Sequence, residues 1–156
     1  MILIVFFYLL SLVCWLGAII FFSFFTAPVV FGRLPVHDAG KVISAIFPRY
    51  YLLGYVAGTV ALVLAFYLMA ARGPRAWWSA TIAALVFALG CTLYAGMVVR
   101  PRIDAIRTVV EQPNPDPVQK ADFDRMHQLS VTLNGLVLLL DLFALFTTAG
   151  AFTHHG

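Results

Sequence analysis

The sequence predicts an all-α integral membrane protein, built as a bundle of four membrane-spanning helices. Hydrophobic residues make up 62% of the 156 positions and charged residues only 11%, whereas a soluble domain carries about 25% charged residues. Four long apolar runs are each able to cross a hydrocarbon layer of about 30 Å, and the segments between them gather the prolines and charges. The whole chain, residues 1–156, is therefore expected to form a single four-span transmembrane domain.

The four spans are expected at about residues 2–31, 52–71, 76–99 and 127–152. The first run carries no charged residue, is longer than the apolar core of a signal peptide and lacks a preceding basic segment. We therefore expect it to be a retained span. In the second span, Gly54 and Gly58 lie four residues apart, a spacing that lets two helix backbones approach closely.

A short amphipathic helix is predicted between the first two spans, at about residues 38–47. Its apolar residues recur at helical spacing and its polar residues fall on the other side. This pattern is typical of a helix that lies in the headgroup plane, and Pro48 is expected to end it. Arg49, Tyr50 and Tyr51 are then expected to form an interfacial anchor at the start of the second span.

A helical hairpin is predicted to extend the bundle between spans three and four. Residues 103–111 carry an apolar stripe opposite charged positions. Asp116 is a good N-cap and Pro117 suits the first helical position. The helix that starts there would run for about 36 residues, or about 54 Å, which exceeds a hydrocarbon core of about 30 Å. Residues 117–126 should therefore project from the membrane and pair with residues 103–111.

Basic residues are distributed unevenly between the connections. The first and third connections hold eight Lys and Arg residues, and the second holds only two. The positive-inside rule therefore places the first and third connections in the cytoplasm and both termini outside. In a bacterium this describes a multi-pass protein of the inner (cytoplasmic) membrane with periplasmic termini. The eight residues are Arg33, Lys41, Arg49, Arg100, Arg102, Arg107, Lys120 and Arg125.

The sequence contains no signature of an enzyme. A nucleophile elbow, a Gly-rich phosphate loop and an HExxH motif are all absent. Cys14 and Cys91 sit inside apolar runs and form no CxxC pair. Because the basic residues lie at membrane edges and interleave with acids, we expect the lipid bilayer as a partner and no nucleic acid. His154 and His155 are interpreted as a flexible tail or tag remnant rather than a metal site.

A polar stripe runs along the fourth span. His127, Asn134, Asp141 and Thr148 are spaced by seven residues, close to two helical turns, and so share one face. An acid inside such an apolar run must face protein, water or a partner, because hydrocarbon offers it no hydrogen bonds. Counting residues from the membrane edge puts Tyr94 at the depth of Asn134. These five residues are the candidate binding or pathway residues.

Three interpretations of the stripe stay open. In the first, Asn134 and Asp141 only hydrogen-bond neighbouring helices, and Asp141 is neutral because burial disfavours its charge. In the second, the stripe lines a pathway for a proton, an ion or a small solute, and Asp141 titrates. In the third, Met97, Met126 and His127, which we estimate to lie at one depth, form a soft-metal site suited to Cu(I).

Two functions from different classes follow from these interpretations. The first is transport or metal tolerance through the stripe. The alternative is a non-catalytic accessory subunit or scaffold that joins a larger membrane complex or a homo-oligomer. No cofactor is firmly predicted, and copper or haem are the candidates to be tested.

Several ordered motifs resemble a known family. They are Trp15-x-Gly17, Pro28, the segment 47–51 (FPRYY), Arg100-Pro101 and the segment 123–134 (FDRMHQLSVTLN). Together they resemble the bacterial domain-of-unknown-function family related to the eukaryotic transmembrane protein 205. The resemblance implies a compact four-span membrane protein and no settled activity, although the eukaryotic relative's link to platinum-drug resistance suggests metal handling or vesicle traffic.

A more distant similarity is to four-span copper-resistance and haem-binding membrane proteins. The Trp15-x-Gly17 start and the Phe-Pro-Arg segment carry this similarity. The spans of this chain lack the histidine pair that a bis-histidine haem requires, because only His127 lies near a span.

Overall fold

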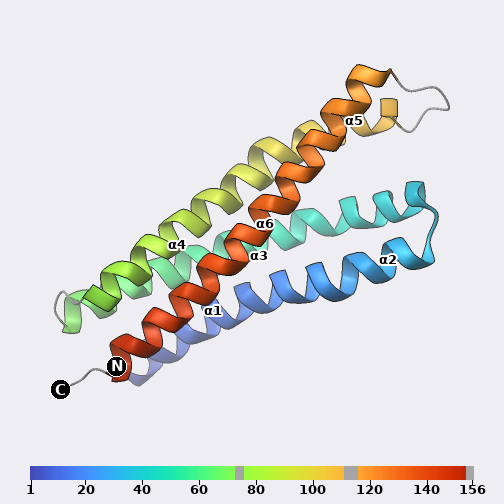
Figure 1. Ribbon diagram of the computed structural model, residues 1–156. Coiled ribbons are helices and arrows are strands. Elements are labelled where there is room, and N and C mark those ends of the chain that lie inside the picture. The colour runs from blue at the N-terminus through green and yellow to red at the C-terminus, as the bar shows by residue number, and fades with distance from the viewer. Residues whose placement is uncertain (73–75, 111–115, 154–156) are drawn as a thin grey trace.

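The structure is a computed structural model that describes residues 1–72, 76–110 and 116–153. All secondary structure in these ranges is helical, and four helices are long and apolar enough to cross a membrane (Figure 1). The fold is therefore the predicted all-α four-helix membrane bundle. The first long helix comprises α1 (Ile2–Phe21), the π-helical turn η1 (Phe22–Thr26) and α2 (Ala27–Arg33); the second is α3 (Val36–Arg72). The third comprises α4 (Ala76–Tyr94), the π-helical turn η2 (Ala95–Val99) and α5 (Arg100–Val110), and the fourth is α6 (Pro117–Thr153).

The two ends of the bundle differ in charge. Met1 and Thr153 lie at one end, which we call the terminal end, and the α2–α3 turn and α5 lie at the other (Figure 1). The second end carries the eight basic residues of the first and third connections, and we call it the basic end. Toward the basic end, the pair formed by α4 and α6 diverges from the pair formed by α1 and α3 (Figure 1).

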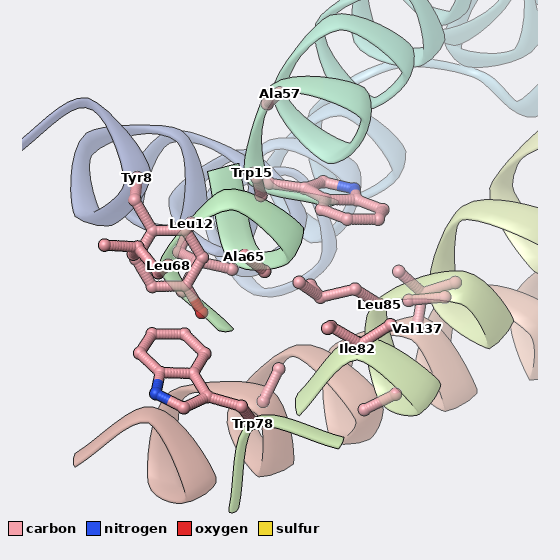
Figure 2. Packing of buried hydrophobic residues seen from close by; sticks show 14 of the residues in the cluster. Tyr8, Leu12, Trp15, Ala57, Ala65, Leu68, Trp78, Ile82, Leu85 and Val137 are labelled. Atoms are coloured by element: carbon pink, nitrogen blue, oxygen red, sulfur yellow. The ribbon is translucent and has the colours of Figure 1, made fainter. Parts of the chain in front are cut away.

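The core is built around aromatic rings set against small residues. Trp15 of α1 is buried and lies against Gly54 and Gly58 of α3, so that a Cβ atom on Gly58 would sit 2.7 Å from two Trp15 ring carbons. The two glycines thus make room on α3 for the Trp15 ring. Figure 2 shows Tyr8 of α1 beside Trp78 of α4, with ring centroids 5.9 Å apart.

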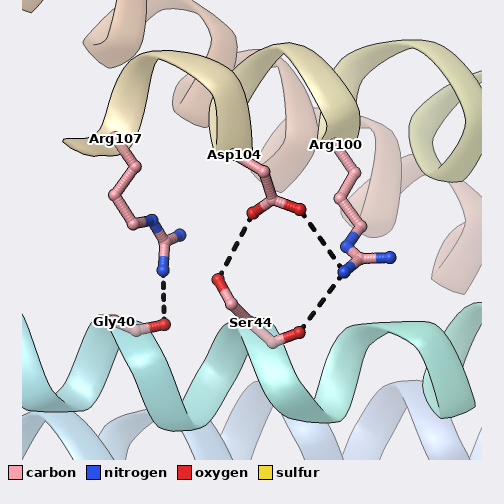
Figure 3. A network of polar contacts seen from close by, with 5 residues as sticks. All are labelled: Gly40, Ser44, Arg100, Asp104 and Arg107. Carbon is pink, nitrogen blue, oxygen red and sulfur yellow. Dashed lines mark hydrogen bonds and ion pairs between the residues drawn. The ribbon is translucent and has the colours of Figure 1, made fainter. Parts of the chain in front are cut away.

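The amphipathic segment 38–47 is helical, but it is not a separate helix ended by Pro48. It forms the first turns of α3, which continues through Pro48 without a break. A proline donates no hydrogen bond to the carbonyl four residues earlier, which here belongs to Ser44. Arg100 of α5 donates to that carbonyl across 3.4 Å (Figure 3). The helix can therefore continue because a neighbour satisfies the carbonyl group that the proline leaves free.

The Arg100→Met substitution should lower the free energy of unfolding less when Pro48 is also replaced. In Pro48→Ala the Ser44 carbonyl regains its helical donor, so the loss in Arg100→Met should shrink by about 1 kcal/mol. Thermal unfolding of the two single variants and the double variant in detergent measures this coupling. Arg102→Met is the control, because Arg102 is exposed on the same helix. Additive effects of Pro48→Ala and Arg100→Met would contradict the role assigned to Arg100.

The two π-helical turns have a common local cause. Each one ends two residues before a proline, Pro28 after η1 and Pro101 after η2. The residue just before each proline donates its N–H to a carbonyl five residues back, Ala27 to Phe22 and Arg100 to Ala95. Proline's ring and missing donor disturb the α-helical ladder, and the widened turn restores backbone hydrogen bonding.

The helical hairpin between spans three and four is present in the described residues. α5 continues from α4 through η2 and lies against the start of α6 (Figure 1). α6 begins at Pro117, and the Asp116 carboxylate accepts a hydrogen bond from the Val118 N–H at 3.1 Å, so Asp116 caps the helix as predicted. With 37 residues, α6 is about 55 Å long.

Candidate functional site

The polar stripe of α6 faces the bundle interior along most of its length. Asp141 is 1% exposed and Thr148 is fully buried, while Asn134 is half-buried. His127 is exposed, at the basic end. The period of seven residues thus marks the inward face of α6 for three of the four positions.

Asn134 is held by a residue that the sequence analysis assigned to the membrane surface. The Tyr50 hydroxyl of α3 donates to Asn134 Oδ1 at 3.1 Å. The Tyr50 ring lies 4.9 Å from that of Phe22 in η1, centroid to centroid. The prediction that Pro48 ends an interfacial helix placed Tyr50 at the membrane surface. Because α3 continues through Pro48, Tyr50 instead lies inside the bundle. A prediction of one continuous helix over residues 36–72 would have placed Tyr50 inside the bundle.

Thr148 belongs to a set of hydroxyl pairs that joins three helices at the terminal end. Its hydroxyl is 2.6 Å from that of Tyr8 on α1. One residue earlier, the Thr147 hydroxyl is 2.7 Å from that of Thr81 on α4. Such pairs between helices contribute about 0.6 kcal/mol each on average in a membrane protein. They close the bundle at this end.

Asp141 has no comparable partner. Neither of its carboxylate oxygens has a hydrogen-bond partner in the described part of the chain. Asp141 lies about nine residues from Gly150, which packs on the Trp77 ring at the terminal end. Nine residues of helix span about 14 Å, close to half of a hydrocarbon layer of about 30 Å. The carboxyl group is therefore buried inside the apolar part of α6, about 14 Å of helix from Gly150.

A cavity of about 1040 Å³ opens where the two helix pairs diverge at the basic end. We call it the basic-end cavity; η1, α2, α3, α5 and α6 all line it. From the stripe it includes His127 and Asn134, and it reaches Leu138, one turn before Asp141. Most of the remaining wall is apolar, with several phenylalanine rings. The cavity therefore leads from the basic end toward the buried acid.

Tyr94 does not join the stripe, contrary to the depth count. Its side chain is 47% exposed, whereas Thr92 on the same helix is buried. Two residues turn a helix by about 200°, so a buried Thr92 places Tyr94 on the lipid-facing side. Tyr50 occupies the position beside Asn134 that the sequence analysis gave to Tyr94.

The proposed soft-metal residues are not gathered at the cavity. Met97 is 62% exposed on η2, and Met126 is half-buried. His127 lines the basic-end cavity, which neither methionine lines, and its ring stacks on Phe123 at 6.3 Å. No group of three or more His, Cys, Asp or Glu side chains in the described ranges is suited to a metal ion. The copper and haem sites stay predictions, and His154 and His155 lie outside the described residues.

The comparisons with known proteins bear on family and not on activity. No curated protein and no solved structure matches the chain. A family model described as a domain of unknown function matches residues 10–112, which run from within α1 to the end of α5 and do not include α6. The match covers more than half of the chain, and the protein therefore belongs to the DUF4149 family.

Proposed function

We propose that this integral membrane protein transports protons through the bundle by protonation and release of Asp141. The observation that carries the proposal is a carboxyl group buried inside α6, a helix long and apolar enough to cross a membrane, without a hydrogen-bond partner among the described residues. An ionisable residue in such a position is costly, and in membrane proteins it commonly marks an ion or proton pathway. The proposal involves transport and no catalytic step.

Access to Asp141 from the basic end supports this role. The basic-end cavity extends as far as Asn134 and Leu138, which lie two turns and one turn before Asp141 on α6. Tyr50 donates to Asn134 and lies within electrostatic range of Asp141. A proton entering from the cavity would pass this amide–phenol pair before it reaches the carboxyl group.

The terminal end would act as the closed gate in this state. The pairs Tyr8–Thr148 and Thr81–Thr147 join α1, α4 and α6 beyond Asp141. Their hydroxyl groups can donate and accept, so they offer polar partners to a proton once the helices separate. Transport would then alternate between the open basic end and an opened terminal end.

A proton-flux assay tests the proposal. The protein is reconstituted in vesicles that contain a pH-sensitive dye, a pH gradient is imposed, and valinomycin with potassium clamps the membrane potential. The natural chain should dissipate the gradient faster than protein-free vesicles, and Asp141→Asn should reduce the rate at least tenfold, because the amide cannot titrate. Asp122→Asn, which removes an exposed carboxyl from the same helix, should leave the flux unchanged.

Two results would overturn the proposal. One is a flux in the natural chain equal to that of protein-free vesicles. The other is an undiminished flux in Asp141→Asn when circular dichroism and gel filtration show a folded protein.

The proposal also includes the orientation. The positive-inside rule puts the basic end, and with it the mouth of the cavity, in the cytoplasm of a bacterium, and the termini in the periplasm. Metal tolerance stays a prediction, as does the relation to transmembrane protein 205. The accessory-subunit role also stays a prediction; a partner that co-purifies in mild detergent would favour it.

A further inference from the structure

We propose that the basic-end cavity binds one anionic phospholipid, with its phosphate at Arg107 and an acyl chain between η1 and α6. This binding site does not depend on proton transport by Asp141. The cavity is large enough for a ligand, since its volume of about 1040 Å³ slightly exceeds the range of about 300–1,000 Å³ for small-molecule sites.

The charges at the cavity favour an anion. Arg107 lines it together with His37 and His127, and no aspartate or glutamate is among the described residues that do so. The Arg107 guanidinium donates through Nη1 to the Gly40 carbonyl of α3, which fixes its position across the cavity mouth (Figure 3). A guanidinium has five N–H donors in a planar fork, so donors remain to bind a phosphate.

Arg107 lies at the basic end, on the polar side of the apolar part of the bundle. Arg107 lies about 30 residues after Trp77, an aromatic residue at the terminal end, so the two are separated by about 45 Å of helix. A bilayer measures about 40–45 Å between its outer polar surfaces. With Trp77 at one edge of a hydrocarbon layer of about 30 Å, Arg107 therefore lies beyond the opposite edge, on the polar side where anionic headgroups are found.

The inner walls of the cavity suit an acyl chain. Phe22, Phe47 and Leu138 line it toward mid-membrane. Phe24 of η1 and Val131 of α6 also line the cavity, and their side chains are 62% and 58% exposed. A lipid chain can thus enter sideways from the bilayer between these two helices. A cation at the surface complements the phosphate of an anionic lipid, and the apolar walls below it complement the acyl chain.

Native mass spectrometry of the delipidated full-length protein tests the site. The probes are dioleoyl phosphatidylglycerol and dioleoyl phosphatidylcholine, which have the same chains and differ in net charge. The natural chain should retain phosphatidylglycerol about fivefold better, as expected for one basic residue near an anionic headgroup. Arg107→Gln should remove this preference. Arg102→Gln, an exposed cation on the same helix that does not line the cavity, should keep it.

A second pair of variants tests the acyl-chain part. Gly135 lines the cavity, and a Cβ atom there would meet no atom within 4 Å. Gly135→Leu should therefore fill the cavity without disturbing the helices and reduce retention of both lipids at least fivefold. Gly90→Leu is the control, because Gly90 is equally open but lies on α4 away from the cavity.

Each alternative result would overturn the proposal. Equal retention of the two lipids by the natural chain excludes a phosphate site that prefers anionic lipids. An unchanged preference in Arg107→Gln excludes this residue as its ligand. Unchanged retention in Gly135→Leu shows that bound lipid lies elsewhere on the bundle.

Discussion

Asp141→Val is expected to melt at a higher temperature than the natural chain and to carry no proton flux. The natural carboxyl group is 1% exposed, and its two oxygens find no hydrogen-bond partner in the described residues. A buried polar group left without a partner costs about 1–3 kcal/mol. Valine has a similar size and no polar atom, so the substitution should recover that free energy.

The matched control is the same type of substitution two turns further along the stripe. Thr148→Val removes a hydroxyl that lies 2.6 Å from the Tyr8 hydroxyl, and so it leaves a buried phenol without its partner. We therefore expect Thr148→Val to lower the melting temperature while Asp141→Val raises it. Thermal unfolding in detergent micelles measures both. A lower melting temperature in Asp141→Val would show that the carboxyl group has a stabilising partner.

Opposite effects on stability and flux would give the acid a clear role. Stabilising replacements commonly lose activity where function needs a destabilised site. A gain in stability without loss of proton flux would instead show that Asp141 is a buried polar residue with no role in transport.

Gly58→Ala is expected to lower the stability of the bundle strongly, although it adds a single methyl group. The added Cβ would lie 2.7 Å from two carbons of the Trp15 ring and 3.1 Å from Leu89 Cδ1. Trp15 is itself 1% exposed, so its ring cannot move aside into open space. Overpacking of this kind costs about 1–3 kcal/mol. Because the hydrophobic effect does not drive helix association in lipid, the close packing lost here is a main source of stability.

Two variants make this prediction specific. Gly90→Ala adds the same methyl group where no atom lies within 4 Å, and it should be neutral or stabilising because alanine favours helix. Trp15→Leu should rescue Gly58→Ala, since the smaller side chain makes room for the methyl group. Melting temperatures of the three single variants and the double variant measure these effects. Similar losses in Gly58→Ala and Gly90→Ala would contradict the packing described here.

The fold was predictable because membrane crossing leaves few choices. Every buried backbone group must be satisfied within the membrane, so long apolar runs have to be helices. The capping by Asp116 and the close approach at Gly58 were also predictable, since both depend on local residue types. The continuation of α3 through Pro48 was not, because it depends on Arg100, more than fifty residues away in the chain.

The candidate site was predicted in part for the same reason. The inward face of Asp141 and Thr148 follows from the period of α6 alone. Pairing across helices requires the rotation of each helix about its own axis, which a depth count does not provide. The depth count therefore placed Tyr94 level with Asn134, whereas the Tyr50 hydroxyl is the group that donates to Asn134. The error about Pro48 and the omission of Tyr50 share one cause, since both follow from ending the helix too early.

The π-helical turn η2 changes the direction in which the side chains of α5 point around the helix axis. One residue advances an α-helix by about 100°, and a π-helical turn accommodates an extra residue without breaking the helix. The five residues of η2 therefore change the helical phase of α5 relative to α4. In an unbroken α-helix, Arg107 would point in a direction about 100° away and could not meet Gly40 on α3. The direction in which the Arg107 side chain points therefore depends on η2, which lies about two helical turns earlier in the chain.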